Sequence, residues 1–215
     1  QAADNAPTAQ RVRPMTPENQ AVTAFFYRQP QLLDREKHKA LRLQPADARF
    51  AASNQAVPLV LPEFPEACLE YPIAFAKGGD GQWLALALTG LQAGTNAFVN
   101  DKGQWLARYV PASVRRYPFI LAEAGKDQLN LAVDLAAPHL GKEGEALFDD
   151  KGEPSEFVRK LMPVLADFQG QALRTSAFIK QLEESGLLLQ QNLQVRLGDQ
   201  SSAVVEGVWI IDEAK

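Results

Sequence analysis

The sequence contains very few residues that bind metals or form covalent cross-links. Cys68 is the only cysteine among 215 residues, and His38 and His139 are the only histidines. A single cysteine excludes an intrachain disulfide and any zinc site built from several thiolates. We therefore expect no metal and no other cofactor. Cys68 lies among apolar residues, which predicts a buried structural thiol rather than a nucleophile.

Long apolar runs and an excess of basic charge are also missing. The most apolar stretch, residues 83–91, is far shorter than the roughly 20 residues that a membrane-spanning helix needs. The formal net charge is -4 at pH 7, whereas general nucleic-acid-binding proteins carry a basic excess. We therefore expect neither a membrane-spanning protein nor a nucleic-acid partner.

Recognisable catalytic motifs are absent. The glycines at 78–81 read GGDG, which lacks the spacing of a dinucleotide fingerprint and the Lys-Ser/Thr of a phosphate-binding loop. No G-x-S-x-G nucleophile elbow occurs. The acids of segment 141–154, Asp149 among them, lie in a glycine-broken charged stretch that predicts a solvated loop, and His139 fits the same interpretation.

Residues 1–20 predict a flexible N-terminal extension, because they are small, polar and interrupted by proline. The first residue is Gln, and two origins are open. A removed signal peptide would place the protein in the periplasm. A natural start at Met15 would place it in the cytoplasm, which is our leading expectation. Residues 21–215 are expected to form a single domain.

Strand patterns dominate residues 71–135. Tyr71 and Tyr117 each begin a Tyr-Pro segment in which an apolar strand, a glycine-bearing turn and a second apolar strand follow one another. Between them, Asn100–Gly103 reads Asn-Asp-Lys-Gly, residues that tolerate the positive φ of a tight turn. We predict an antiparallel meander of about six strands over residues 71–135.

Helical periodicity begins at Ser155, a residue suited to cap a helix. The apolar residues that follow share one helical face, and Gly186 is suited to end the helical region. Pro163 should kink this helix or split it, so we predict a helical pair over residues 155–185. Alternating residues then predict a final β-hairpin. Together these elements define an α+β fold with helices packed on an antiparallel sheet.

Several blocks of this sequence resemble the SapC family of bacterial proteins. The most specific is YVPASVRRYPF at residues 109–119, and the likeness extends over roughly Tyr27 to Asp212. The blocks that carry it are residues 25–43, 54–76, 90–121, 144–158 and 175–188.

This resemblance implies a genomic and cellular setting, but it does not imply a particular reaction. The family is named for a protein encoded with a surface-layer export system, and members occur beside genes for outer-membrane receptors and flavin-dependent halogenases. It offers no established catalytic residues. Its members begin near the position of Met15 and continue past Lys215, so we expect the native protein to extend beyond this chain.

Arg115 and Arg116 are unusual because they interrupt an apolar run. If both lie in a strand, one of them must face the core and needs a partner. One interpretation is a structural clamp to acids such as Glu70 or Asp134, or to a helix C-terminus. The other is an anion-binding site in which an arginine donates to a carboxylate between flat aromatic walls. The predicted binding residues are Arg115, Arg116, Tyr117, Tyr109, Trp105 and Tyr71.

Two classes of function follow from these observations and the resemblance. The leading hypothesis is a non-enzymatic binding or accessory protein of envelope export or uptake, with a peptide, protein or small acidic ligand as its partner. The alternative is an enzyme or enzyme partner that uses Arg116, Tyr117 and a loop acid such as Asp149. A scaffold that docks another subunit is a third possibility, and it requires both arginines to be paired.

Overall fold

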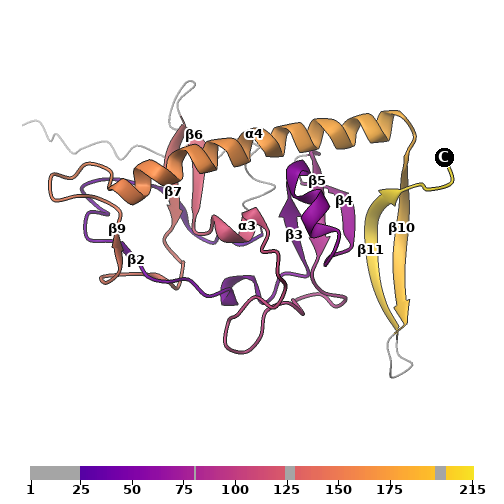
Figure 1. Cartoon of the computed structure of the whole chain (residues 1–215), viewed down its shortest axis with the longest axis horizontal. Helices are drawn as coiled ribbons and strands as arrows, with labels where there is room; N and C mark the ends of the chain where they lie inside the picture. The colour runs from indigo at the N-terminus through magenta and orange to yellow at the C-terminus, as the bar shows by residue number, and fades with distance from the viewer. Residues whose placement is uncertain (1–24, 80, 124–128, 197–201) are drawn as a thin grey trace, which may run out of the picture.

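Separate antiparallel sheets lie along one long helix, α4 (Figure 1). The computed structural model describes residues 25–79, 81–123, 129–196 and 202–215. The predicted extension at residues 1–20 therefore lies outside the described residues. The mixture of helix, antiparallel strands and a closing hairpin confirms the predicted α+β class.

The largest sheet has the strand order β10-β11-β4-β5-β3. All of its pairings are antiparallel, and β4 and β5 pair from Ile73↔Ala87 to Lys77↔Trp83. Its strands are β3 (Ala56–Leu59), β4 (Ile73–Lys77), β5 (Trp83–Leu88), β10 (Leu188–Arg196) and β11 (Ser202–Ile211). The pair β10 and β11 is the predicted final hairpin.

A second sheet has the order β1-β7-β6, and a smaller one has the order β8-β2-β9. Their strands are β1 (Pro30–Leu32), β2 (Arg42–Leu43), β6 (Phe119–Glu123), β7 (Leu129–Asp134), β8 (Leu140–Gly141) and β9 (Glu145–Ala146). The short helical segments are η1 (Arg49–Ala51), η2 (Leu61–Glu63), α2 (Phe64–Ala67) and α3 (Ala112–Arg115). The helix α4 runs from Glu156 to Glu184.

The predicted meander over residues 71–135 is wrong in one respect. The two hairpins are present, but β4-β5 belongs to the larger sheet and β6-β7 to the other one. The predicted turn at Asn100–Gly103 is also present, with Gly103 at a φ of 76°. However, only an isolated bridge between Val99 and Trp105 flanks that turn. Loops and the helix α3 separate the hairpins, so they do not stack as neighbours.

The predicted helical pair is one continuous helix. Ser155 caps α4 as expected, since its side chain accepts a hydrogen bond from the Val158 amide. Pro163 is exposed on the solvent side, where water can satisfy the Arg159 carbonyl that has lost its partner. Leu165 and Phe168, just beyond the proline, are buried. Their packing holds the helix together across the proline.

Helix α4 closes two hydrophobic cores. Val158 and Leu165 in its first half pack with β6 and β7 residues, and Ile179 in its second half packs with residues of the larger sheet. The backbone amide of Leu61 in η2 also donates to the Thr175 hydroxyl at 2.8 Å. The sheets therefore keep fixed positions relative to one another because they pack against one common helix.

We predict that Pro163→Ala stabilises the protein by about 1 to 3 kcal/mol, because alanine restores a helical hydrogen bond and carries no ring clash. Urea unfolding followed by circular dichroism measures this gain. The matched control is Val164→Ala, an exposed neighbour on the same helix, which should change the free energy of unfolding by no more than about 0.5 kcal/mol. A loss of stability in Pro163→Ala would contradict the continuous helix.

Candidate functional site

The two adjacent arginines lie in a helical segment and not in a strand, the case that the sequence analysis considered. Arg115 is the last residue of α3, and Arg116 is its C-terminal cap. Helix formation begins after Pro111, a residue whose fixed φ suits a helix start. Because the backbone is helical here, successive side chains do not alternate between two faces.

The buried carboxylate of Glu63 fixes the position of α3. Glu63 is only 5% exposed, and its Oε1 accepts hydrogen bonds from the Ala112 amide at 2.7 Å and the Tyr109 hydroxyl at 2.6 Å. Its Oε2 accepts from the Val60 amide at 2.7 Å. The Ser113 hydroxyl adds a bond to the Pro58 carbonyl at 2.6 Å. These contacts tie α3 to β3 and η2, so the arginines are presented from a fixed backbone.

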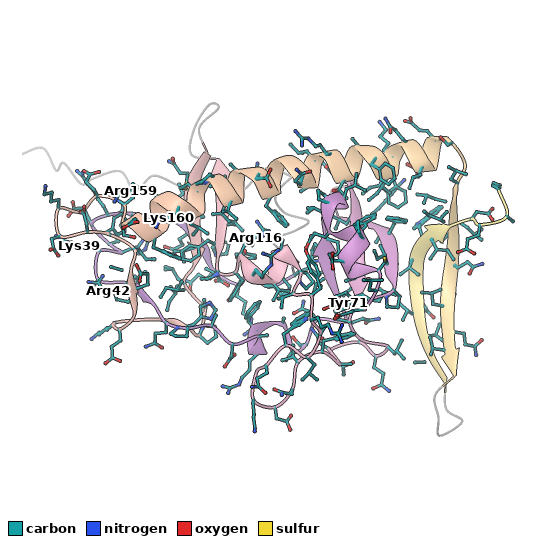
Figure 2. The ribbon with its side chains drawn as sticks, in the orientation of Figure 1. Lys39, Arg42, Tyr71, Arg116, Arg159 and Lys160 are labelled. Atoms are coloured by element: carbon teal, nitrogen blue, oxygen red, sulfur yellow. The ribbon has the colours of Figure 1, made fainter. Side chains whose placement is uncertain are left out.

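Arg115 and Arg116 have different surroundings. Arg115 is exposed, and its Nε donates to the Val110 carbonyl at 3.0 Å. Arg116 lies between α3 and α4 (Figure 2), and its Nε is buried without a hydrogen-bond partner among the described residues. Its guanidinium lies over the Phe168 ring at 4.2 Å and the Tyr27 ring at 5.7 Å.

No carboxylate in the described ranges forms an ion pair with Arg116. The predicted clamp to Glu70 or Asp134 is therefore wrong. Glu70 accepts from the Arg108 amide at 2.7 Å, and fully buried Asp134 accepts from the Tyr117 hydroxyl at 3.0 Å and from backbone amides. Burial lowers the pKa of Arg116, but a guanidinium stays protonated at neutral pH.

Arg116 lines an open groove of about 690 Å³, here named the Arg116 groove. Helix α3 contributes one side, the start of α4 the second, and the β2 and β9 segments the third. Its walls are Leu43–Ala46, Arg115–Tyr117, Phe119, Gly144, Glu145, Phe157 and Leu161. The groove therefore combines two cationic side chains with an apolar lining and one exposed carboxylate, Glu145.

Tyr117 joins this groove to the core. Its ring stacks on Phe50 with a centroid distance of 4.0 Å. Burial, with the neighbouring Asp134 carboxylate as the next cause, raises the pKa of the Tyr117 hydroxyl. The hydroxyl stays protonated at neutral pH and donates to Asp134, so it serves as a fixed donor rather than a base.

The other three predicted binding residues do not line the groove. The Trp105 indole donates to the Tyr71 hydroxyl at 2.8 Å, and that hydroxyl donates to the Tyr109 carbonyl. Figure 2 places Tyr71 well apart from Arg116. Burial raises the pKa of Tyr71 to about 12 and that of Tyr109 to about 12, so both rings act as neutral hydrogen-bonding groups. Tyr109 also borders a separate hollow of about 440 Å³ with Glu66 and Glu70.

Four labelled cations gather near the start of α4 in Figure 2, namely Lys39, Arg42, Arg159 and Lys160. Lys160 pairs with Glu156 at 2.6 Å, and Arg159 donates to the Pro154 carbonyl at 2.6 Å. Lys39 donates to the Asp150 carbonyl at 3.5 Å. These contacts describe a solvated surface of mixed charge, where single ion pairs contribute little. Arg116 differs from them because it is half-buried and its guanidinium lies over two aromatic rings.

Sequence reasoning did not identify Phe168, Tyr27 or Phe157 as parts of the site. Phe168 and Phe157 read as core residues of an amphipathic helix, which is also how they pack. An arginine above an aromatic ring leaves no pattern in the sequence, since the two residues are 52 positions apart. The one indirect signal in the sequence was that Arg115 and Arg116 interrupt an apolar run.

Cys68 and His139 also differ from their predictions. Cys68 is exposed, not buried. His139 is only 5% exposed, although the sequence analysis placed it in a solvated loop. Its ring lies 5.3 Å from that of Tyr117, and neither ring nitrogen has a hydrogen-bond partner among the described residues. Burial lowers the pKa of His139.

Two kinds of feature are absent from the described residues. No helix there is long and apolar enough to span a bilayer. No group of three or more potential metal ligands occurs in the described part of the chain. The acids Asp149 and Asp150 are exposed, as predicted.

The fold is that of an α+β protein, and a half-buried arginine lines its groove. The chain is a member of the SapC family, whose family model matches residues 33–215. No curated protein and no solved structure matches it. The matched range contains the groove and every predicted binding residue.

The two histidines predict how stability depends on pH. Burial lowers the pKa values of both His139 and His38 below 6.5, so the unfolded chain binds protons first as the pH falls. The free energy of unfolding should therefore be highest above about pH 6.5 and decrease as the pH falls towards 5. Guanidinium unfolding at pH 7, 6 and 5 measures this slope.

His139→Leu should reduce that slope, and adding His38→Asn should remove most of it. His38 makes a suitable comparison because its Nδ1 accepts from the Asp34 amide at 2.9 Å, whereas the His139 nitrogens have no such contact. An unchanged slope in the double variant would contradict the assignment, since the sequence holds no other histidine.

Proposed function

We propose that this protein is a non-enzymatic binding and accessory protein of the SapC type. It acts in the bacterial cytoplasm beside envelope export or uptake systems, and it recognises a carboxylate on a peptide, protein or small acidic ligand. The Arg116 groove is the binding site, with Arg116 as the principal donor and Arg115 and Tyr117 at its side. The observation that carries the proposal is a half-buried guanidinium that forms no ion pair with any carboxylate of the described residues.

The energetics of Arg116 support this role. Burying a charge is costly, and structural arginines usually recover the cost through a paired carboxylate. Contacts with the Phe168 and Tyr27 rings recover part of it, about 0.5 to 2 kcal/mol for a cation over an aromatic face. The remaining donor capacity is available to an external anion. The site is thus organised before the ligand arrives, which lowers the entropic cost of binding.

The contacts of the alternative catalytic residues favour binding over catalysis. The Tyr117 hydroxyl is already engaged with Asp134, and its raised pKa makes it a poor base. The Asp149 carboxylate accepts from the amides of Lys151 and Glu153 in its own turn. Glu145 is the one carboxylate along the groove wall, and it is exposed. These groups do not form an acid and base pair around a reacting atom.

Binding of butanoate, followed by NMR chemical-shift titration, tests this proposal. Arg116→Met should weaken butanoate binding by about tenfold to a hundredfold, because a charge-assisted hydrogen bond contributes about 1.5 to 3 kcal/mol. Arg116→Lys should bind with intermediate affinity, since lysine keeps the charge but not the planar fork. Arg115→Met is the matched control and should lose less than Arg116→Met.

The same variants separate a site from a structural clamp. Arg116→Met should leave the free energy of unfolding unchanged or raise it by about 1 kcal/mol, because it removes a half-buried charge that has no carboxylate partner in the described part of the chain. A clamp would instead lose about 3 to 5 kcal/mol. The proposal fails if Arg116→Met binds butanoate as the wild type does, or if the wild type shows no binding.

A further inference from the structure

The walls of the Arg116 groove restrict the kind of carboxylate that fits. Phe157 and Leu161 are one helical turn apart on α4, so their side chains lie on the same face. Both are only partly buried, as is Leu43 of β2, while Phe119 of β6 is 2% exposed. These four side chains present hydrocarbon to the groove and offer no donor or acceptor.

The charged and apolar parts of the groove lie at different positions along α4. In Figure 1, α3 lies below the middle of α4, whereas β2 and β9 lie below its first turns. Arg116 contacts the ring of Phe168, seven residues beyond Leu161. At 1.5 Å per helical residue, this spacing is about 10 Å. A ligand held at Arg116 therefore reaches the apolar wall only through a body of several carbon atoms.

The net charge of the walls also limits the charge of the ligand. Arg115 and Arg116 provide two positive charges, but Glu145 borders the same groove. Both arginines lie at the α3 end of the groove, so a second anionic group at the far end of the ligand would meet either hydrocarbon or this carboxylate, and both contacts are unfavourable. A single carboxylate with an uncharged remainder avoids both.

We propose that the Arg116 groove takes an apolar monocarboxylate, with the carboxylate at Arg116 and the apolar body along Phe157 and Leu161. This inference rests on the proposed function and narrows its ligand class. The shared chemistry could be supplied by a free hydrophobic acid or by the C-terminal residue of a peptide. The exposed wall at Gln44–Ala46 leaves room for a peptide chain to leave the groove.

Comparing octanoate with butanoate tests the apolar contribution. Each methylene that becomes fully buried adds about fourfold to the affinity, so octanoate should bind the wild type at least tenfold more tightly than butanoate. Octanamide, which lacks the charge, should show no measurable binding. Suberate, an eight-carbon diacid, should bind more weakly than octanoate because its second carboxylate meets the apolar wall.

Substitutions in the α4 wall of the groove test its apolar contacts with the ligand. Leu161→Ser should reduce octanoate affinity to near that of butanoate while leaving butanoate binding within about twofold. Phe157→Leu gives a milder change that preserves the fold if Leu161→Ser unfolds. Leu173→Ser is the matched control, because Leu173 is an exposed leucine of the same helix outside the groove, and it should change neither affinity.

The two sources of the ligand are separated by acetyl-Gly-Gly-Phe and its C-terminal amide. Binding of the free-acid peptide at least as tightly as octanoate, with loss in the amide, assigns the site to peptide C-termini. Much weaker peptide binding assigns it to free acids. Equal, Arg116-dependent binding of butanoate and octanoate would overturn this inference and leave the proposed function standing. The absence of any carboxylate binding would overturn both.

Discussion

The contact between the Arg116 guanidinium and the Phe168 ring is the interaction on which the rest of the site depends. Phe168 is 7% exposed, yet it belongs to neither of the two apolar clusters that α4 closes. The ring lies between them and is covered by a cation at 4.2 Å. A charged group thus occupies a position that a globular protein usually fills with hydrocarbon. The anion binding that we propose for the groove depends on this arrangement.

Helix α4 makes that arrangement possible. Its two halves are fixed by separate cores, and the Thr175 contact with η2 adds a polar tie. Glu63 fixes α3 from the other side by accepting hydrogen bonds from the Ala112 amide and the Tyr109 hydroxyl. Neither tie uses Arg116, so the arginine is positioned by the fold without contributing a necessary contact to it. In the proposed function, stability and recognition therefore depend on different residues, and Arg116 needs no carboxylate partner among the described residues to keep the fold.

Sequence patterns predicted the local elements better than their assembly. Ser155, the turn at Asn100–Gly103 and the two Tyr-Pro hairpins have local signals, and the structure contains each of them. The division of the hairpins between sheets depends on distant contacts that no local pattern reports. The predicted break at Pro163 is wrong because the tertiary packing of α4 contributes more stability than the lost hydrogen bond costs. The unusual character of Arg116 was predictable, whereas its aromatic partners and its helical backbone were not.

The most direct test is an NMR measurement of the Arg116 side chain at pH 7. If the guanidinium is enclosed and lies over Phe168, its Nε proton should exchange slowly with water and resonate upfield because of the ring current. Phe168→Leu should remove the upfield shift, and adding octanoate to the wild type should move the resonance again. A fast-exchanging proton at the position of a solvated arginine, unaffected by Phe168→Leu, would contradict the account.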